Sequence, residues 1–152
     1  MSTETSRIGH PANDAQRRVL ELVRHWEHTY NTDVERLVTE CYAPDAHLCF
    51  NMAETRGHAQ LLDVCRGVFG ACPTRRFRID RVQFIGDDTA VVEAVVLDLA
   101  QPDFYSPFCS LLTVRDGRIV RDRTYLEPTR WPGLEGAIGK VSPGGLGSPG
   151  CG

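Results

Sequence analysis

The chain lacks several features that would assign it to a membrane, secreted or nucleic-acid-binding class. No apolar run is long enough to cross a bilayer, and the polar start "MSTETSRIGHPAND" has no signal-peptide core. The formal net charge is only −3, so no electrostatic argument favours binding to nucleic acid or to an anionic membrane. These absences predict a cytoplasmic protein that has neither nucleic acid nor a membrane as a partner.

The cysteines and histidines show no metal-binding pattern. The six cysteines form no CxxC motif, and none lies at zinc-finger spacing from a histidine. His25 and His28 lie three residues apart on a predicted helix, but no third ligand accompanies them. We therefore predict no metal and no cofactor, and we expect most cysteines to be small buried apolar residues.

The composition, 41% hydrophobic and 24% charged, is typical of a globular domain. Apolar residues recur at helical spacing in three segments, 11–33, 34–41 and 58–70. Alternating or continuous apolar patterns predict strands at 47–51, 75–86, 89–100, 108–114 and 119–127. A break in the alternation near Arg81 predicts a β-bulge.

The order of these elements predicts an α+β fold. We expect a curved, mixed but mostly antiparallel sheet that wraps around helices to form a cone with an internal pocket. The first and third helices would close that pocket. We expect residues 1–12 to be disordered, residues 13–138 to form the domain, and the Gly/Pro-rich residues 139–152 to be a flexible tail.

Two motifs carry a resemblance to a known superfamily. The early "PDAHL…NMAETRGH" and the late "VRDGRIVRDRTYLEP", in this order of elements, resemble the SnoaL-like and limonene-epoxide-hydrolase-like branches of the NTF2-like (cystatin-like cone) superfamily. The similarity covers roughly residues 14–138. It implies the cone fold, which hosts isomerases, cyclases, hydrolases, dehydratases and binding modules.

The resemblance allows functional positions of the family to be matched to residues in the early and middle strands. A Tyr-x-Asn pair that helps hold the catalytic water of the epoxide hydrolases matches Cys49 and Asn51. An Arg-x-Asp pair of the same branch matches Ala94 and Val96, so that pair is absent. The position of the steroid-isomerase base holds Phe50 or Asn51, and neither residue is a base.

In the last strand, Trp-x-Asp followed by Tyr-x-Asp matches Asp122, Thr124, Tyr125 and Glu127. Thr124 thus replaces the pocket aspartate, and a carboxylate stands two residues earlier. These departures argue against a standard epoxide hydrolase or steroid isomerase. They leave a SnoaL-like cyclase or isomerase, or a binding protein.

Asp122 is the first candidate catalytic residue. Strand side chains alternate, so Asp122 and Thr124 share a face, and the resemblance places that face in the pocket. A carboxylate in an apolar pocket has a raised pKa and can act as a general acid or base. Thr124 would then contact the substrate. The alternative is that Asp122 pairs with an arginine at the edge of the sheet.

Asn51 and Glu127 are the other candidate catalytic residues. The Asn51 amide could orient a water or an enolate oxygen, or it could form an Asx-turn. It shares its strand face with Cys49 and His47, which we expect to contact the substrate. His47 could also be a proton shuttle, or it could simply be a half-exposed residue at the start of its strand. Glu127 could be catalytic, or it could anchor the C-terminal turn.

The first helix and the middle strand supply the remaining predicted pocket residues. Trp26 and Tyr30 lie on the apolar stripe of the first helix. Ala94 and Val96 would face the pocket, with Asp98 near its mouth. The other face of this strand is also apolar and needs a cover, which predicts a homodimer packed sheet to sheet.

Together these patterns predict a cofactor-independent acid–base enzyme. It would be a cyclase, isomerase or dehydratase of a small hydrophobic, polyketide- or terpenoid-like molecule. The alternatives are a non-catalytic small-ligand-binding or dimerisation module, or a divergent epoxide hydrolase.

Overall fold

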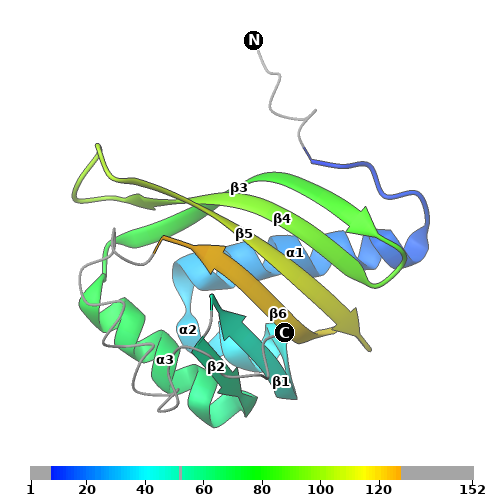
Figure 1. Ribbon diagram of the computed structural model, residues 1–152, viewed down its shortest axis with the longest axis horizontal. Coiled ribbons are helices and arrows are strands. Elements are labelled where there is room, and N and C mark those ends of the chain that lie inside the picture. The colour runs from blue at the N-terminus through cyan, green and yellow to red at the C-terminus, as the bar shows by residue number, and fades with distance from the viewer. Residues whose placement is uncertain (1–7, 52, 128–152) are drawn as a thin grey trace.

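One mixed sheet organises the protein, as the computed structural model shows for residues 8–51 and 53–127 (Figure 1). Its six strands lie in the order β2-β1-β6-β5-β4-β3. The strands are β1 (Tyr42–Phe50), β2 (Ala53–Arg56), β3 (Arg75–Ile85), β4 (Thr89–Asp98), β5 (Tyr105–Arg115) and β6 (Arg118–Leu126). Among these six strands of the described residues, β1 and β6 pair in parallel and every other neighbouring pair is antiparallel. The predicted α+β class with a mixed, mostly antiparallel sheet is confirmed.

The helices form where the apolar periodicity predicts them. They are α1 (Asp14–Thr32), α2 (Val34–Arg36), which continues into a π-helical turn (Leu37–Cys41), and α3 (Gly57–Ala71). Asn13 caps α1 by accepting a hydrogen bond from the Gln16 backbone, and Asp33 caps α2 in the same way. Of the helices in the described part of the chain, none is long and apolar enough to span a membrane.

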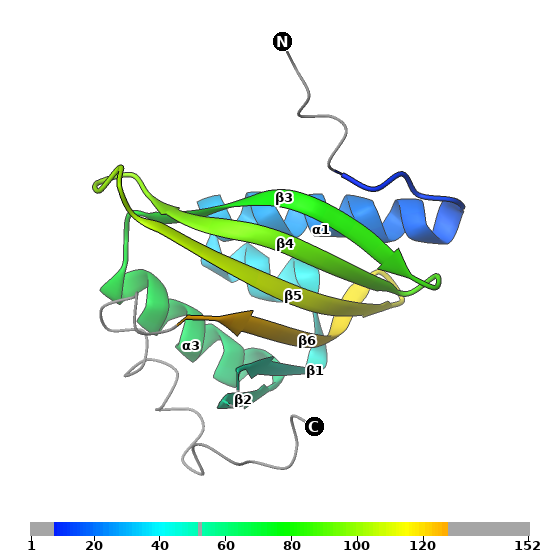
Figure 2. The ribbon, with the colours of Figure 1, turned by 45° about the horizontal axis from the view of Figure 1, so that its top comes forward.

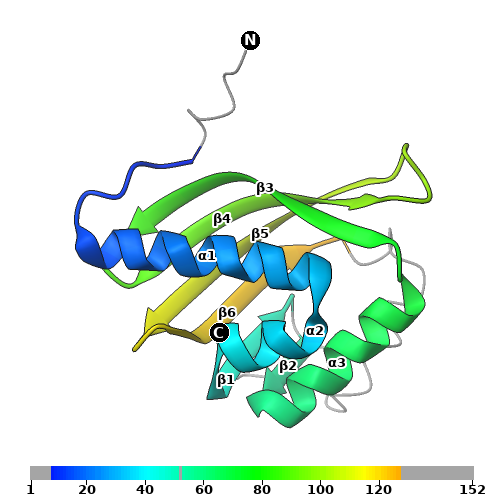
Figure 3. The same cartoon turned by 180° about the vertical axis from the view of Figure 1, so that it is seen from behind.

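The helices cover one face of the sheet. Figure 3 shows α1 lying across strands β3 to β6 and α3 beside β1 and β2. The turned view shows the long strands β3, β4 and β5 curving along α1 (Figure 2). The core lies between the helices and this inner face, and its fully buried members include Val23, Leu48, Leu61, Val92 and Leu112.

Irregularities in strand pairing help to decide which side chains face inward, and two of them bear on the predictions. The register of β3 against β4 shifts between Ile79 and Arg81, as the predicted bulge requires. A second shift, between Tyr42 and His47 where β1 pairs with β6, was not predicted. The short strand β2 was not predicted either, and it forms the edge of the sheet next to β1.

The chain ends are described only in part. Ile8 pairs with Val82, and the Gly9 amide donates to the Val82 carbonyl at 2.8 Å. Residues 8 and 9 are therefore ordered, within the segment 1–12 that we expected to be disordered. Residues 1–7 and everything from residue 128 onward, including the predicted tail 139–152, lie outside the described residues.

Candidate active site

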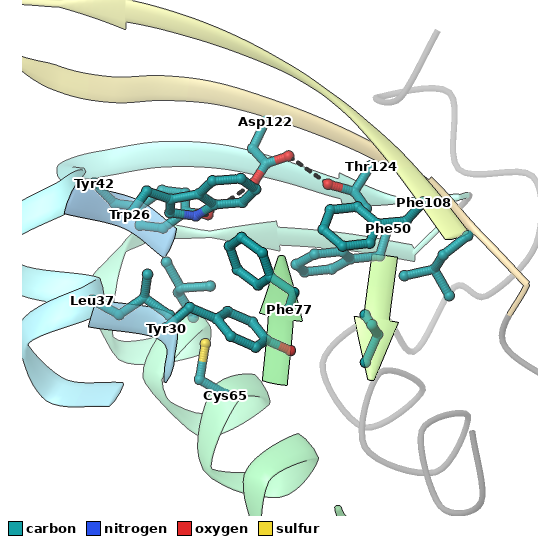
Figure 4. Close-up of a pocket in the computed structure, with 13 residues that line it drawn as sticks. Trp26, Tyr30, Leu37, Tyr42, Phe50, Cys65, Phe77, Phe108, Asp122 and Thr124 are labelled. Carbon is teal, nitrogen blue, oxygen red and sulfur yellow. Dashed lines mark hydrogen bonds between the residues drawn. The ribbon is translucent and has the colours of Figure 1, made fainter. Parts of the chain in front are cut away.

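A cavity of about 70 Å³ lies between the helices and the inner face of the sheet (Figure 4). Its walls are mostly apolar and aromatic. The lining residues are Trp26, Tyr30, Leu37, Tyr42, Phe50, Leu61, Cys65, Phe77, Val96, Phe108, Asp122, Thr124 and Leu126. Asp122 is the only carboxylate among them.

Asp122 lies on β6 with its side chain inward and 1% exposed. Each of its carboxylate oxygens accepts a hydrogen bond. The Tyr42 hydroxyl donates to Oδ2 at 2.8 Å, and the Thr124 hydroxyl donates to Oδ1 at 2.7 Å. The carboxylate is therefore held in one orientation at the wall of the cavity.

These two donors are themselves held by further hydrogen bonds. The Trp26 indole Nε1–H donates to the Tyr42 hydroxyl at 2.9 Å. On the other side, the Ser110 hydroxyl lies 2.6 Å from that of Thr124, because Ser110 and Thr124 stand opposite each other on β5 and β6. The network joins α1, β1, β5 and β6 around one carboxylate.

The environment of Asp122 raises its proton affinity. Burial raises the pKa of Asp122 to about 6, and the hydrogen bonds from Thr124 and Tyr42 oppose that shift. Burial and the neighbouring Asp122 raise the pKa of Tyr42 well above its ordinary value, so Tyr42 remains a donor. At neutral pH Asp122 is thus mostly ionised, yet basic enough to accept a proton.

The other titratable groups in the cavity stay protonated. Burial is the main reason that the pKa of the Cys65 thiol is raised to about 12. Burial likewise raises the pKa of Tyr30 above its ordinary value. Neither is a nucleophile at neutral pH. Among the described residues, no cluster of three His, Cys, Asp or Glu could hold a metal ion.

The structure brings five of the predicted site residues together at the cavity. Trp26, Tyr30, Val96, Asp122 and Thr124 all line it. The alternative for Asp122, an ion pair with an arginine at the edge of the sheet, does not occur in the described structure.

The expectation that His47 and Cys49 line the pocket is wrong. Leu48 and Phe50 take the inward positions of β1, so His47 and Cys49, which alternate with them, point to the other face. His47 Nε2 lies 2.9 Å from a Glu54 carboxylate oxygen and 3.6 Å from Cys49 Sγ. Burial, and next the nearby Arg56, lower the pKa of His47.

Asn51 does not line the cavity either, so the expected role in orienting substrate does not fit its position. Its amide donates to the Leu126 carbonyl at 2.8 Å and accepts from the Leu126 amide at 3.0 Å. Its backbone has a φ of +53°, in the left-handed region that Asn tolerates. Asn51 therefore fastens the end of β1 to the end of β6.

Three further predicted residues also lie outside the cavity wall. Ala94 is buried in the core and is not a lining residue. Asp98 forms a buried ion pair with Arg75 and accepts a hydrogen bond from the Ala100 amide, so it stabilises the strand ends rather than the pocket mouth. Glu127 is exposed and does not line the cavity.

Tyr42 and Ser110 were missed by the sequence reasoning. Tyr42 directly follows the π-helical turn, where neither helical nor strand periodicity indicates its direction. Ser110 looked like an ordinary polar residue in an apolar strand. Its position opposite Thr124 could have been found only from the register of β5 and β6.

We expect Tyr42→Phe to raise the pKa of Asp122 above about 6, because a hydrogen bond that favours the ionised form is lost. It should also destabilise the fold by about 1–3 kcal/mol, since the Trp26 indole N–H loses its buried acceptor. A ¹³C NMR titration of the Asp122 carboxyl carbon measures the first effect. Tyr125→Phe, the same change on the outer face, should leave that titration unmoved. An unchanged Asp122 titration in Tyr42→Phe would contradict the assignment.

The fold and cavity define a cone-shaped α+β domain whose cavity is lined by a single carboxylate, that of Asp122. The chain belongs to the SnoaL-like domain family, whose model matches residues 19–122. The resemblance predicted from the two motifs is thereby confirmed. The comparison with curated proteins gave no significant match.

Solved structures agree with this fold. A protein assigned as a SnoaL-like polyketide cyclase from Jannaschia sp. CCS1 has a TM-score of 0.68 and 17% identity, covering 88% of this chain and 98% of its own. An assigned isomerase of the SnoaL-like family from Agrobacterium tumefaciens has a TM-score of 0.63 and 15% identity, with coverage of 73% and 98%. An assigned polyketide cyclase from Sinorhizobium meliloti has a TM-score of 0.60 and 24% identity, with coverage of 68% and 93%. At these identities the likeness establishes the fold.

Proposed function

We propose that the protein is a cofactor-independent acid–base enzyme that acts on a small hydrophobic, carbonyl-bearing molecule. The reaction would be a cyclisation, isomerisation or dehydration of a polyketide- or terpenoid-like substrate. One observation carries the proposal: the only carboxylate among the lining residues is buried at the cavity wall and held by two hydroxyl donors. Such an arrangement is suited to moving a proton.

Asp122 would act as the base. Its carboxylate takes a proton from the carbon next to the substrate carbonyl, and the electron pair of the broken C–H bond moves into an enolate. The resulting carboxylic acid then returns the proton to another atom, so Asp122 ends the cycle unchanged. Tyr42 and Thr124 would act as positioning residues, because each fixes one carboxylate oxygen.

The size of the cavity limits what enters it. At roughly 10–15 Å³ for each water-sized sphere, about 70 Å³ holds a group of roughly five non-hydrogen atoms. A larger substrate would place only its reacting end beside Asp122, unless rings such as Phe50 and Phe108 move aside.

The proposal predicts that the protein catalyses exchange of α-hydrogens in small ketones dissolved in D₂O. We expect the exchange rate, followed by ¹H NMR, to rise with pH and level off above an apparent pKa of about 6. Asp122→Asn should lower the rate by about 10²–10⁴-fold, because the base is removed.

Asp63→Asn is the matched control for this experiment. It makes the same change at an exposed position of α3 and should leave the rate unchanged. Exchange that persists in Asp122→Asn would exclude Asp122 as the base. A protein that binds small ketones without catalysing exchange would instead be the non-catalytic ligand-binding module, the alternative that the missing family carboxylates favour.

We further propose that the outer face of the sheet forms a homodimer. This face exposes Tyr105 and Tyr125 to 52% and 50%, beside Pro107 and Cys109. Light scattering at micromolar concentration should give twice the chain mass of 16.9 kDa. Tyr125→Glu should shift the protein toward the monomer, because it places a carboxylate in that contact. A mass near 17 kDa for the unmodified protein would contradict the proposal.

A further inference from the structure

The Asp122 carboxylate is a buried charge without a cationic partner in the described structure. None of the ion pairs among residues 8–51 and 53–127 involves it. Its two partners are neutral hydroxyl groups, and they offset the cost of burial only in part. Buried charges in proteins are usually paired, so the cavity leaves one negative charge for a ligand to neutralise.

The walls near this carboxylate are aromatic. The ring of Phe77 lies at the centre of a cluster, 4.8 Å from Trp26, 4.4 Å from Tyr30 and 5.5 Å from Phe108 between ring centroids. Figure 4 shows these side chains grouped around the cavity with the Asp122 carboxylate. Aromatic faces attract cations through the ring quadrupole, but they offer no strong hydrogen-bond acceptor to replace the water that solvates an N–H cation.

The volume of the cavity and its few hydrogen-bonding groups limit which cations it can bind. A primary ammonium needs three acceptors, whereas few polar atoms line this cavity and the hydroxyls of Tyr42 and Thr124 already have partners. A methylated ammonium has fewer N–H groups or none, so it needs few hydrogen-bond acceptors or none, and its methyl groups can pack against the apolar walls. A trimethylammonium group has four non-hydrogen atoms, which is within the capacity of a cavity of about 70 Å³.

We propose that the cavity binds a small alkylated ammonium group, with its charge against the Asp122 carboxylate and its methyl groups against the rings of Trp26, Phe77 and Phe108. This inference goes beyond the proposed function and does not depend on it. A bound cation would occupy the carboxylate that removes the proton, so it would inhibit the ketone exchange reaction. Equilibrium binding can be measured without turnover, so either proposal can fail alone.

The experiment compares two probes that differ in one atom. They are (2-hydroxyethyl)trimethylammonium and its neutral carbon isostere, 3,3-dimethylbutan-1-ol. Isothermal titration calorimetry with the full chain at pH 7.5 should show the cation binding at least tenfold more tightly. Equal binding of the two probes, or binding of neither, would overturn the inference.

The pH dependence gives a second readout. Besides Asp122, the titratable groups that line the cavity are Tyr30, Tyr42 and Cys65, and all three keep their protons between pH 5 and pH 8. Affinity for the cation should therefore fall about tenfold from pH 7.5 to pH 5, as Asp122 becomes protonated, while the isostere is unaffected. Cation binding that strengthens as the pH falls would contradict the inference.

Two variants measure separately how the Asp122 charge and the aromatic rings contribute to cation binding. Asp122→Asn should abolish the preference for the cation over the isostere. Phe108→Leu keeps the carboxylate and removes one ring, so it should weaken cation binding several-fold while changing isostere binding little. The second variant keeps the test valid if the first does not fold, and an unchanged preference in a folded Asp122→Asn would refute the site.

Discussion

Asp122→Asn is expected to raise the free energy of unfolding at pH 7 by up to about 3 kcal/mol. Burial raises the pKa of Asp122 from 3.8 to about 6. A difference of one in pKa between the folded and unfolded protein changes the free energy of unfolding by about 1.4 kcal/mol. The ionised carboxylate is therefore less stable in the folded protein than in the unfolded chain. Asparagine has nearly the same shape and no charge, and the Thr124 hydroxyl can turn to accept a hydrogen bond from its amide, since it also faces Ser110.

The pH dependence fixes the sign of this effect. Because the folded pKa is raised, the favourable contribution of protonated Asp122 is fully present below pH 3.8 and is lost as the pH rises through about 6. The variant should be the more stable protein above pH 6, and its advantage should shrink toward pH 4. Urea denaturation of both proteins from pH 4 to pH 8 measures the difference. A variant that is clearly less stable at pH 7 would contradict the buried, unpaired state of Asp122.

Arg75→Met is expected to lower the melting temperature by roughly 10 °C, because it leaves the Asp98 carboxylate buried without its cation. Arg75 begins β3 and Asp98 ends β4, and the two are only 6% and 7% exposed. The Arg75 guanidinium also lies 3.6 Å over the ring of Phe104. A hydrogen bond from Thr74, together with bonds from the Ala100 amide and Arg75, lowers the pKa of Asp98, so the charge persists at neutral pH.

A double substitution shows whether the loss comes from the unpaired charge. Arg75→Met combined with Asp98→Asn removes both charges and should recover most of the melting temperature. Arg78→Met is the matched control, since Arg78 pairs with Asp80 at the surface and such pairs contribute little. A Tm for Arg75→Met that matches the Arg78→Met control would mean that the buried pair does not stabilise the sheet. Calorimetry of the four proteins makes the comparison.

The predictions from sequence were most accurate where the pattern is local and regular. The stripe with Val19, Leu22 and Trp26 indicated α1, and the two-residue period of "RDRTYLE" placed Asp122 and Thr124 on one face. The break near Arg81 marked the bulge of β3. Each of these features depends only on near neighbours in the chain.

The predictions failed where a strand's phase depends on its partners. His47, Cys49 and Asn51 follow the alternation of β1, but nothing local says which of its two faces is inner. The register shift between Tyr42 and His47 is settled by pairing with β6, about 75 residues later in the chain. That pairing turned Phe50 into the cavity and left Asn51 to fasten the strand ends.

The sequence by itself determined the helices, the strands other than β2, the α+β class, the family and the position of Asp122 beside Thr124, because helical and strand periodicities are properties of the chain. Only the tertiary structure decided the surroundings of that carboxylate. Tyr42, Trp26 and Ser110 come from three other elements. They contact the Asp122–Thr124 pair, directly or through each other, only when the sheet has formed and packs against α1. Burial, hydrogen bonding and the pKa of Asp122 all follow from that assembly, since desolvation arises only when distant segments exclude water together.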